Sequence, residues 1–74
     1  WHPPPMLTKK SFTLSGHRTS VALETEFWTV LQQIARTRGV ALAALVAEID
    51  TGRGARPLAS ALRLAALAAN RAAF

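Results

Sequence analysis

A short alternating run of residues constrains most strongly how this chain can fold. Between His17 and Glu24, Val21 and Leu23 form an apolar side. The intervening positions, which would face the other way, are charged or small: Arg18, Ser20 and Ala22. A period of two is typical of a β-strand. Because a lone strand leaves its N–H and C=O groups unpaired, it must pair with another strand, and the same strand of a second copy is the obvious candidate.

The length of the chain also favours association. A chain of 74 residues allows one small domain, and a lone core of this size rarely supplies more than about 3–5 kcal/mol. There is no cysteine, so neither a disulfide nor a thiolate metal site can supplement it. Half of the residues are hydrophobic. We therefore expect at least a dimer.

The charge of the chain points to a polyanionic partner. Nine Lys and Arg stand against four Asp and Glu, which gives a net charge of +5. This balance favours nucleic acid first and an anionic membrane surface second. No apolar run approaches the ~20 residues needed to cross a bilayer, and the start of the chain lacks the pattern of a secretory signal. We expect a cytoplasmic protein with no membrane partner.

The N-terminal part divides into two segments. Residues 1–8 are expected to form an extended arm because Pro3, Pro4 and Pro5 favour polyproline II. Trp1 either packs on a partner or belongs to an added extension. Residues 9–14 alternate again and are followed by a Ser-Gly turn pair. They form either a second strand of a hairpin or an extended lead-in, and the pattern leaves both open.

Two amphipathic helices are predicted next. The first spans about 25–38 and carries an apolar stripe: Phe27, Val30, Leu31, Ile34 and Ala35. Gly39 ends it. The second spans 40–50 and has its own stripe: Leu42, Leu45, Val46 and Ile49. Its start lacks a capping side chain, because Ala41 and Ala43 stand where Ser, Thr, Asp or Asn would be expected.

Residues 51–57 form a basic, glycine-containing loop. It has no Gly-Lys-Ser/Thr ending, so it does not match a phosphate-binding loop. Its Arg53 and Arg56 either lie in solvent or touch DNA phosphates.

A third helix is expected after Pro57, up to about Ala72, within a C-terminal oligomerisation segment of residues 58–74. It is apolar nearly all round, which predicts burial against a neighbouring subunit. A membrane-surface helix is the weaker alternative, because Arg63 and Arg71 make a thin polar face. The expected oligomer contacts are Trp28, Leu58, Leu62, Leu64 and Leu67. Trp28 has an alternative role, packing on the third helix or on the arm.

Catalytic and metal chemistry find little support. The serines have no identifiable base, the carboxylates stand at helix ends, and only His2 and His17 offer nitrogen ligands. We predict neither an enzyme nor a cofactor or metal site.

Several motifs between Lys9 and Asp50 resemble those of a bacterial ribbon-helix-helix family. They are the strand sequence Gly-His-Arg-Thr-Ser-Val-Ala-Leu-Glu, the triplets Glu26-Phe27-Trp28 and Arg38-Gly39-Val40, and the run Leu45 to Asp50. The resemblance implies a mostly α fold for residues 9–50, built as an obligate homodimer. Two copies of the strand pair around Val21 as an intermolecular antiparallel β-ribbon above four helices, and the C-terminal helix is an addition.

The resemblance also implies roles for individual residues. In operator-binding members the ribbon enters the major groove. Its outward residues, the expected base contacts, are Arg18, Ser20 and Ala22. The start of the second helix would hold a phosphate through Val40, Ala41 and Leu42. Further expected phosphate contacts are Lys9, Lys10, His17, Arg53 and Arg56. The expected dimer core comprises Val21, Leu23, Phe27, Val30, Leu31, Ile34, Leu42, Leu45, Val46 and Ile49.

Two functions follow from these patterns. The first is a sequence-selective protein that binds double-stranded DNA, a transcriptional regulator or antitoxin-type repressor acting as a homodimer. The alternative is a non-catalytic scaffold in which such dimers assemble into higher oligomers and bind a protein partner instead of DNA.

Overall fold

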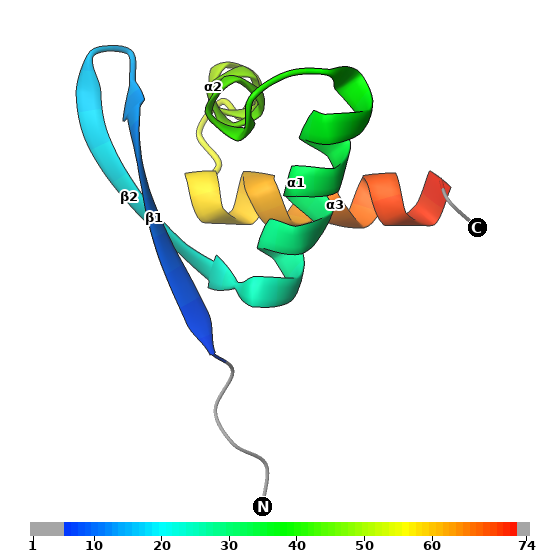
Figure 1. The fold of residues 1–74 in the computed structure, drawn as a ribbon. Helices are drawn as coiled ribbons and strands as arrows, with labels where there is room; N and C mark the ends of the chain where they lie inside the picture. The colour runs from blue at the N-terminus through cyan, green and yellow to red at the C-terminus, as the bar shows by residue number, and fades with distance from the viewer. Residues whose placement is uncertain (1–5, 73–74) are drawn as a thin grey trace, which may run out of the picture.

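A β-hairpin followed by three helices makes up the computed structural model, which describes residues 6–72 (Figure 1). The elements are β1 (Leu7–Leu14), β2 (His17–Glu24), α1 (Thr25–Arg38), α2 (Leu42–Gly52) and α3 (Leu58–Ala72). The hairpin lies along one side of the helices, and α3 runs across α1 (Figure 1). None of the helices in this part of the chain is long and apolar enough to cross a membrane.

Local turn chemistry sets the hairpin. β1 and β2 pair antiparallel with Leu7 opposite Glu24 and Leu14 opposite His17. The two loop residues Ser15 and Gly16 have φ values of 51° and 80°. Two positive φ values are characteristic of a type I′ turn, whose twist matches that of the strands it joins. Of the two readings left open for residues 9–14, the hairpin is therefore the one observed.

The start of β1 lies inside the segment expected to be an arm. Leu7 and Thr8 belong to the strand, opposite Glu24 and Leu23. The expectations for Trp1 and for residues 2–5 lie outside the described part of the chain.

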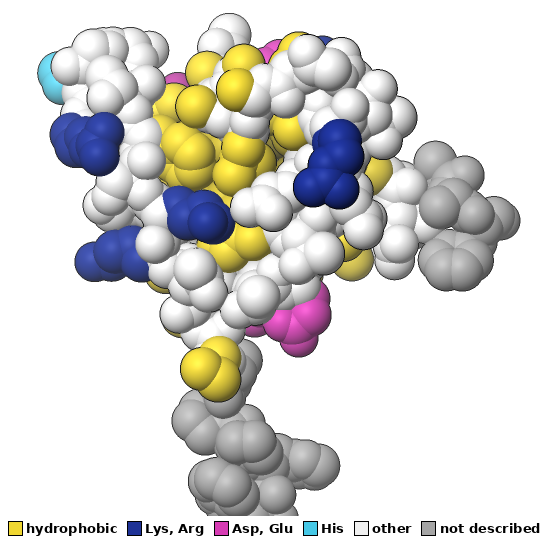
Figure 2. Space-filling view, viewed as in Figure 1, with side chains coloured by type: hydrophobic (Ala, Val, Ile, Leu, Met, Phe, Trp, Pro, Cys, Tyr) yellow, Lys and Arg dark blue, Asp and Glu magenta, His cyan; other side chains and the backbone are white. Residues whose placement is uncertain are grey.

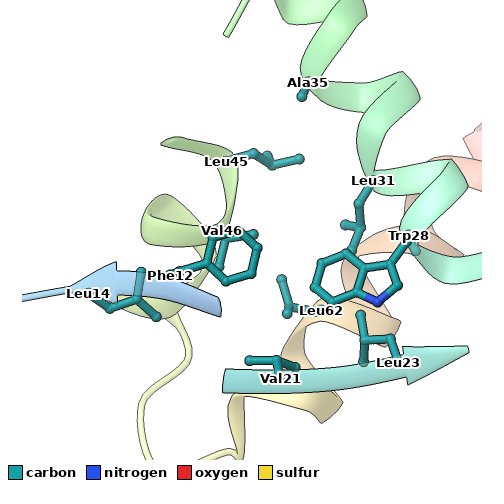
Figure 3. Close-up of a cluster of buried hydrophobic side chains, with 11 residues drawn as sticks. Phe12, Leu14, Val21, Leu23, Trp28, Leu31, Ala35, Leu45, Val46 and Leu62 are labelled. Carbon is teal, nitrogen blue, oxygen red and sulfur yellow. The ribbon is translucent and has the colours of Figure 1, made fainter. Parts of the chain in front are cut away.

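The inner face of the hairpin and the facing sides of the three helices share one core (Figure 3). The predicted alternation of β2 is confirmed, because Val21 and Leu23 are buried while Arg18 and Ser20 are exposed. The whole cluster consists of Phe12, Leu14, Val21, Leu23, Trp28, Leu31, Ala35, Leu45, Val46, Leu62 and Ala66. One face of the sheet is thus covered, and the other is left open.

Trp28 holds β1 against α1. Its indole Nε1 donates a hydrogen bond to the carbonyl oxygen of Thr8 at 2.7 Å, and its ring centroid lies 5.9 Å from that of Phe12. Only 2% of the side chain is exposed. The structure thus assigns Trp28 to the chain's own core and not to an oligomer contact. Thr8 lies in the segment that the sequence predicted to be an arm. The contact therefore agrees with the alternative predicted for Trp28, packing on the arm.

α1 ends at the glycine that the sequence predicted as its stop. Gly39 takes a φ of 70° at the end of α1, and the N–H of Val40 donates to the carbonyl of Ala35 at 2.9 Å. α2 begins at Leu42 with Ala41 as its N-cap, and no side chain caps it. Arg38 and Glu48 form an ion pair at 2.8 Å that joins the two helices.

One face of α3 packs inside the same chain. Ala61, Leu62 and Ala66 are buried, with Leu62 fully inaccessible. The expectation of burial against a neighbouring subunit is corrected for this face, because β2, α1 and α2 leave an apolar surface that α3 covers. Leu64 and Leu67 remain 44% and 49% exposed on its outer side.

An ion pair joins the end of β2 to α3. Arg63 Nε lies 2.9 Å from Glu24 Oε1, and the Arg63 guanidinium lies 5.9 Å from the ring centroid of Phe27. The pKa of Glu24 is lowered from its ordinary value, first by a main-chain hydrogen bond at Glu24 and then by the bond from Arg63. Both interactions favour the ionised carboxylate.

Replacement of Leu62 tests the packing of α3. Leu62→Ala removes a fully buried side chain and should lower the free energy of unfolding by about 2–5 kcal/mol, through lost burial and the cavity left behind. Leu67→Ala is the matched control on the outer side of the same helix, with an expected change within about 0.5 kcal/mol. Urea unfolding at one protein concentration measures both, and equal losses would contradict this placement of α3.

Replacement of Glu24 tests the link between β2 and α3. Because folding lowers the pKa of Glu24, its stabilising contribution is present above the ordinary value of 4.5 and is lost as the pH falls through the folded value. Glu24→Gln should therefore be less stable than wild type at neutral pH, and the difference should shrink in acid. Arg63→Met should remove only part of this pH-dependent stability. Thermal unfolding from pH 7 to pH 2 measures this, and a difference that does not vary with pH would refute the link.

Candidate nucleic-acid interface

The outward face of the hairpin brings the three predicted base contacts together with residues of β1. The register places Arg18 opposite Thr13, Ser20 opposite Ser11, and Ala22 opposite Lys9. Since alternate residues of a strand point to opposite faces, all of these side chains point away from the buried Val21 and Leu23. Dark blue Lys and Arg side chains gather along the hairpin side of the molecule (Figure 2).

Hydroxyl groups link the two strands across this face. The Oγ atoms of Ser11 and Ser20 lie 2.9 Å apart, and Arg18 Nη1 donates to Thr13 Oγ1 at 3.4 Å. Ser11 and Thr13 were not predicted as site residues. Their alternation with Phe12 and Leu14, combined with the two-residue turn, was the signal that could have placed them opposite Ser20 and Arg18.

Acidic groups are scarce on this face. The only carboxylate on either strand is that of Glu24 at the end of β2, and Arg63 pairs with it. Lys9 and Arg18 lie on the face, and the exposed His17 stands beside the turn. The result is a surface of cations and hydroxyl groups, both of which bind phosphate and base edges.

The outer edge of β2 has unpaired main-chain groups. Leu14 and His17 flank the turn, so they form the first hydrogen-bonded pair, and such pairs alternate along an antiparallel ladder. The N–H and C=O groups of Arg18, Ser20 and Ala22 consequently point away from β1. In residues 6–72, main-chain hydrogen bonds outside the helices and the hairpin involve only residues from Ala35 onward. This edge is therefore open to another strand.

The expected phosphate contacts of the hairpin occupy different positions. Lys9 lies on the outward face, whereas Lys10 lies on the inner side with its Nζ 5.8 Å from the centroid of the Trp28 ring. Lys10 is accordingly half-buried. The structure thus places Lys9 and Lys10, both predicted as phosphate contacts, on opposite faces of the hairpin.

The basic loop expected at residues 51–57 begins later, because Thr51 and Gly52 belong to α2. Its two arginines differ in their surroundings. Arg53 donates to Asp50 Oδ1 and to the carbonyl of Arg56, both at 2.7 Å, so its guanidinium is occupied within the loop. Arg53 is therefore less available to a DNA phosphate than expected. Arg56 is exposed.

The start of α2 is less available to a phosphate than expected. The N–H of Val40 is already bonded to the carbonyl of Ala35, and Leu42 is half-buried. Ala41 is exposed but offers no hydroxyl group. Of the three expected amides, that of Val40 is therefore engaged within the chain.

The expected dimer core separates into two groups. Val21, Leu23, Leu31, Leu45 and Val46 are buried within the single chain. The half-buried group consists of Phe27, Val30, Ile34, Leu42 and Ile49. Val30 and Ile34 line an open hollow of about 430 Å³ between α1 and the end of α3. Only the second group retains surface that a partner could cover.

Among the expected oligomer contacts, Leu62 is fully buried in the chain's own core, like Trp28. Leu58 is half-buried, and Leu64 and Leu67 are exposed.

For metals, the residues that the structure describes contain no group of three or more His, Asp or Glu side chains that could hold an ion.

Comparison with known proteins identifies the family. Residues 7–69 match a family model described as a ribbon-helix-helix domain. Neither the curated proteins nor the solved structures compared with the chain give a match. The match includes β1, β2, α1, α2 and most of α3, so it agrees with the order of strand and helices in the structure. The chain belongs to the family of ribbon-helix-helix domains.

Proposed function

We propose that this protein is a sequence-selective DNA-binding regulator, of transcriptional-regulator or antitoxin type, that acts as a homodimer. The observation that carries the proposal is the outward face of the hairpin, where Lys9 and Arg18 flank a pair of serine hydroxyls and no carboxylate is free. Ribbon-helix-helix domains are generally DNA-binding regulators, which supports the same function.

The side chains on this face suit base recognition in the major groove. That groove admits a two-stranded β-ribbon. Arg18 can bond guanine O6 and N7 together, Ser20 can donate or accept, and the Ala22 methyl can contact the methyl group of thymine. Sequence preference should therefore depend mainly on Arg18 and Ser20.

The open edge of β2 supports the homodimer. Pairing two copies antiparallel around Val21 would satisfy the unpaired main-chain groups of both strands. β1 is the less suitable edge, because edge lysines such as Lys9 discourage further pairing.

Replacement of Arg18 tests base recognition. Against a duplex selected from a random library, Arg18→Ala should lower the preference over an unrelated duplex by about 1–3 kcal/mol, the usual cost of losing a bidentate base contact. Arg18→Lys conserves the charge, so it should lose preference while retaining more of its binding to any duplex. Fluorescence anisotropy at several salt concentrations measures both variants.

Two results would exclude this function. One is an absence of salt-dependent binding of wild type to duplex DNA at low ionic strength. The other is an Arg18→Ala variant whose affinity and sequence preference both equal those of wild type.

A second candidate function rests on the outer side of α3. Leu64 and Leu67 are large, exposed and close together on one helix, which suits contact with another protein. In this alternative, ribbon-helix-helix dimers join through α3 into a larger scaffold that binds a protein partner.

Mass measurement distinguishes the scaffold from a plain dimer. Deletion of α3 would be uninformative, because Leu62 belongs to the core. The double variant Leu64→Ser, Leu67→Ser instead changes only exposed positions. For the scaffold, light scattering should show a wild-type mass above that of a dimer and a dimer mass for the variant. A wild-type dimer unchanged by the substitutions would exclude it.

A further inference from the structure

A two-chain ribbon needs one strand from each chain, whereas the hairpin gives each chain two. We infer that β1 is a phosphate-contacting flank of the DNA-binding sheet, with Lys9, Ser11 and Thr13 as its contacts, while β2 reads the bases. This inference rests on the proposed function, because it assumes that two chains pair through β2 and meet DNA with their outward faces.

The width of the resulting sheet separates the roles of the strands. Pairing through β2 gives the strand order β1, β2, β2, β1 across the dimer. With neighbouring strands about 4.8 Å apart, the two inner strands fit within the major groove, whereas the outer strands lie roughly 14 Å from each other. The groove is about 12 Å wide. The β1 strands therefore lie over its walls, which are formed by the phosphate backbones.

The outward side chains of β1 have the chemistry that this position requires. Lys9, Ser11 and Thr13 share the outward face, and no residue of Leu7–Leu14 is acidic. An ammonium group and hydroxyl groups are common donors to phosphate oxygens, which position a protein on DNA without reading its sequence. Lys9 also stands opposite Ala22, so it supplies a cation where β2 offers only a methyl group.

The hydrogen bonds across the face leave donors free for phosphate. A hydroxyl has one donor and two acceptor sites. Thr13 Oγ1 accepts from Arg18, so its own O–H remains available to a phosphate oxygen. The Ser11 and Ser20 hydroxyls share one hydrogen between them, which leaves the other to donate outward. The same bonds connect the phosphate flank to the base-reading strand.

Lys10 provides an internal contrast. It precedes Ser11 on β1 but lies on the opposite face, over the Trp28 ring. Lys9 and Lys10 therefore carry the same charge on the same strand, and only Lys9 faces the proposed DNA surface. A matched pair of substitutions follows from this arrangement.

The experiment compares Lys9→Gln with Lys10→Gln in the full chain, on a selected duplex and on an unrelated one, across a series of salt concentrations. Losing one phosphate contact per subunit removes two from a dimer, so Lys9→Gln should flatten the plot of log affinity against log salt by about 1.8. The affinity for both duplexes should fall by the same factor. Lys10→Gln should leave the slope unchanged.

The results separate this inference from the proposed function. If wild type shows no salt-dependent binding, the proposed function fails, and this inference fails with it. If wild type binds but Lys9→Gln leaves the slope unchanged, or Lys10→Gln flattens it equally, only the role of β1 is overturned. A loss of sequence preference in Lys9→Gln would also overturn it, because losing a phosphate contact should weaken binding to all sequences alike. Circular dichroism of each variant confirms that the folded protein is being compared.

Discussion

The pairing requirement of the strand main chain shapes this molecule more than any side-chain contact. β2 needs hydrogen-bonding partners on two edges, and within residues 6–72 a partner strand, β1, lies on only one of them. That single pairing aligns Lys9, Ser11 and Thr13 with Ala22, Ser20 and Arg18, and it turns Phe12 and Leu14 toward the helices. The composition of the outward face and the position of the core both follow from it.

The sequence predicted the elements with strong periodicity well. The bounds of α1 agree with the apolar stripe and with Gly39 as its stop, and the uncapped start of α2 is found at Ala41. The inward positions Val21 and Leu23 and the outward positions Arg18 and Ser20 followed from a period of two. These predictions succeed because each depends on neighbouring residues in one element.

Predictions that depended on contacts between distant segments were less successful. A stripe of apolar residues shows that a helix has a face to bury, but not which surface will cover it. Leu62 therefore looked available to a second subunit, whereas the other elements of the same chain enclose it. For Trp28 the sequence left both an oligomer contact and packing within the chain open, and only the contact with Thr8 decides between them. The loop arginines are a similar case, because composition cannot show that Asp50 and the Arg56 carbonyl engage Arg53.

The hairpin's short loop has a consequence for the order of events in assembly. Strands joined by a two-residue turn meet through contacts close in sequence, and hairpins form in about 1–10 μs. Encounters between two chains at ordinary protein concentrations are far slower. In the proposed dimer, each recognition surface would thus be complete before the subunits meet. Association would join two preformed sheets instead of folding them, and its rate should depend on diffusion and charge more than on chain ordering.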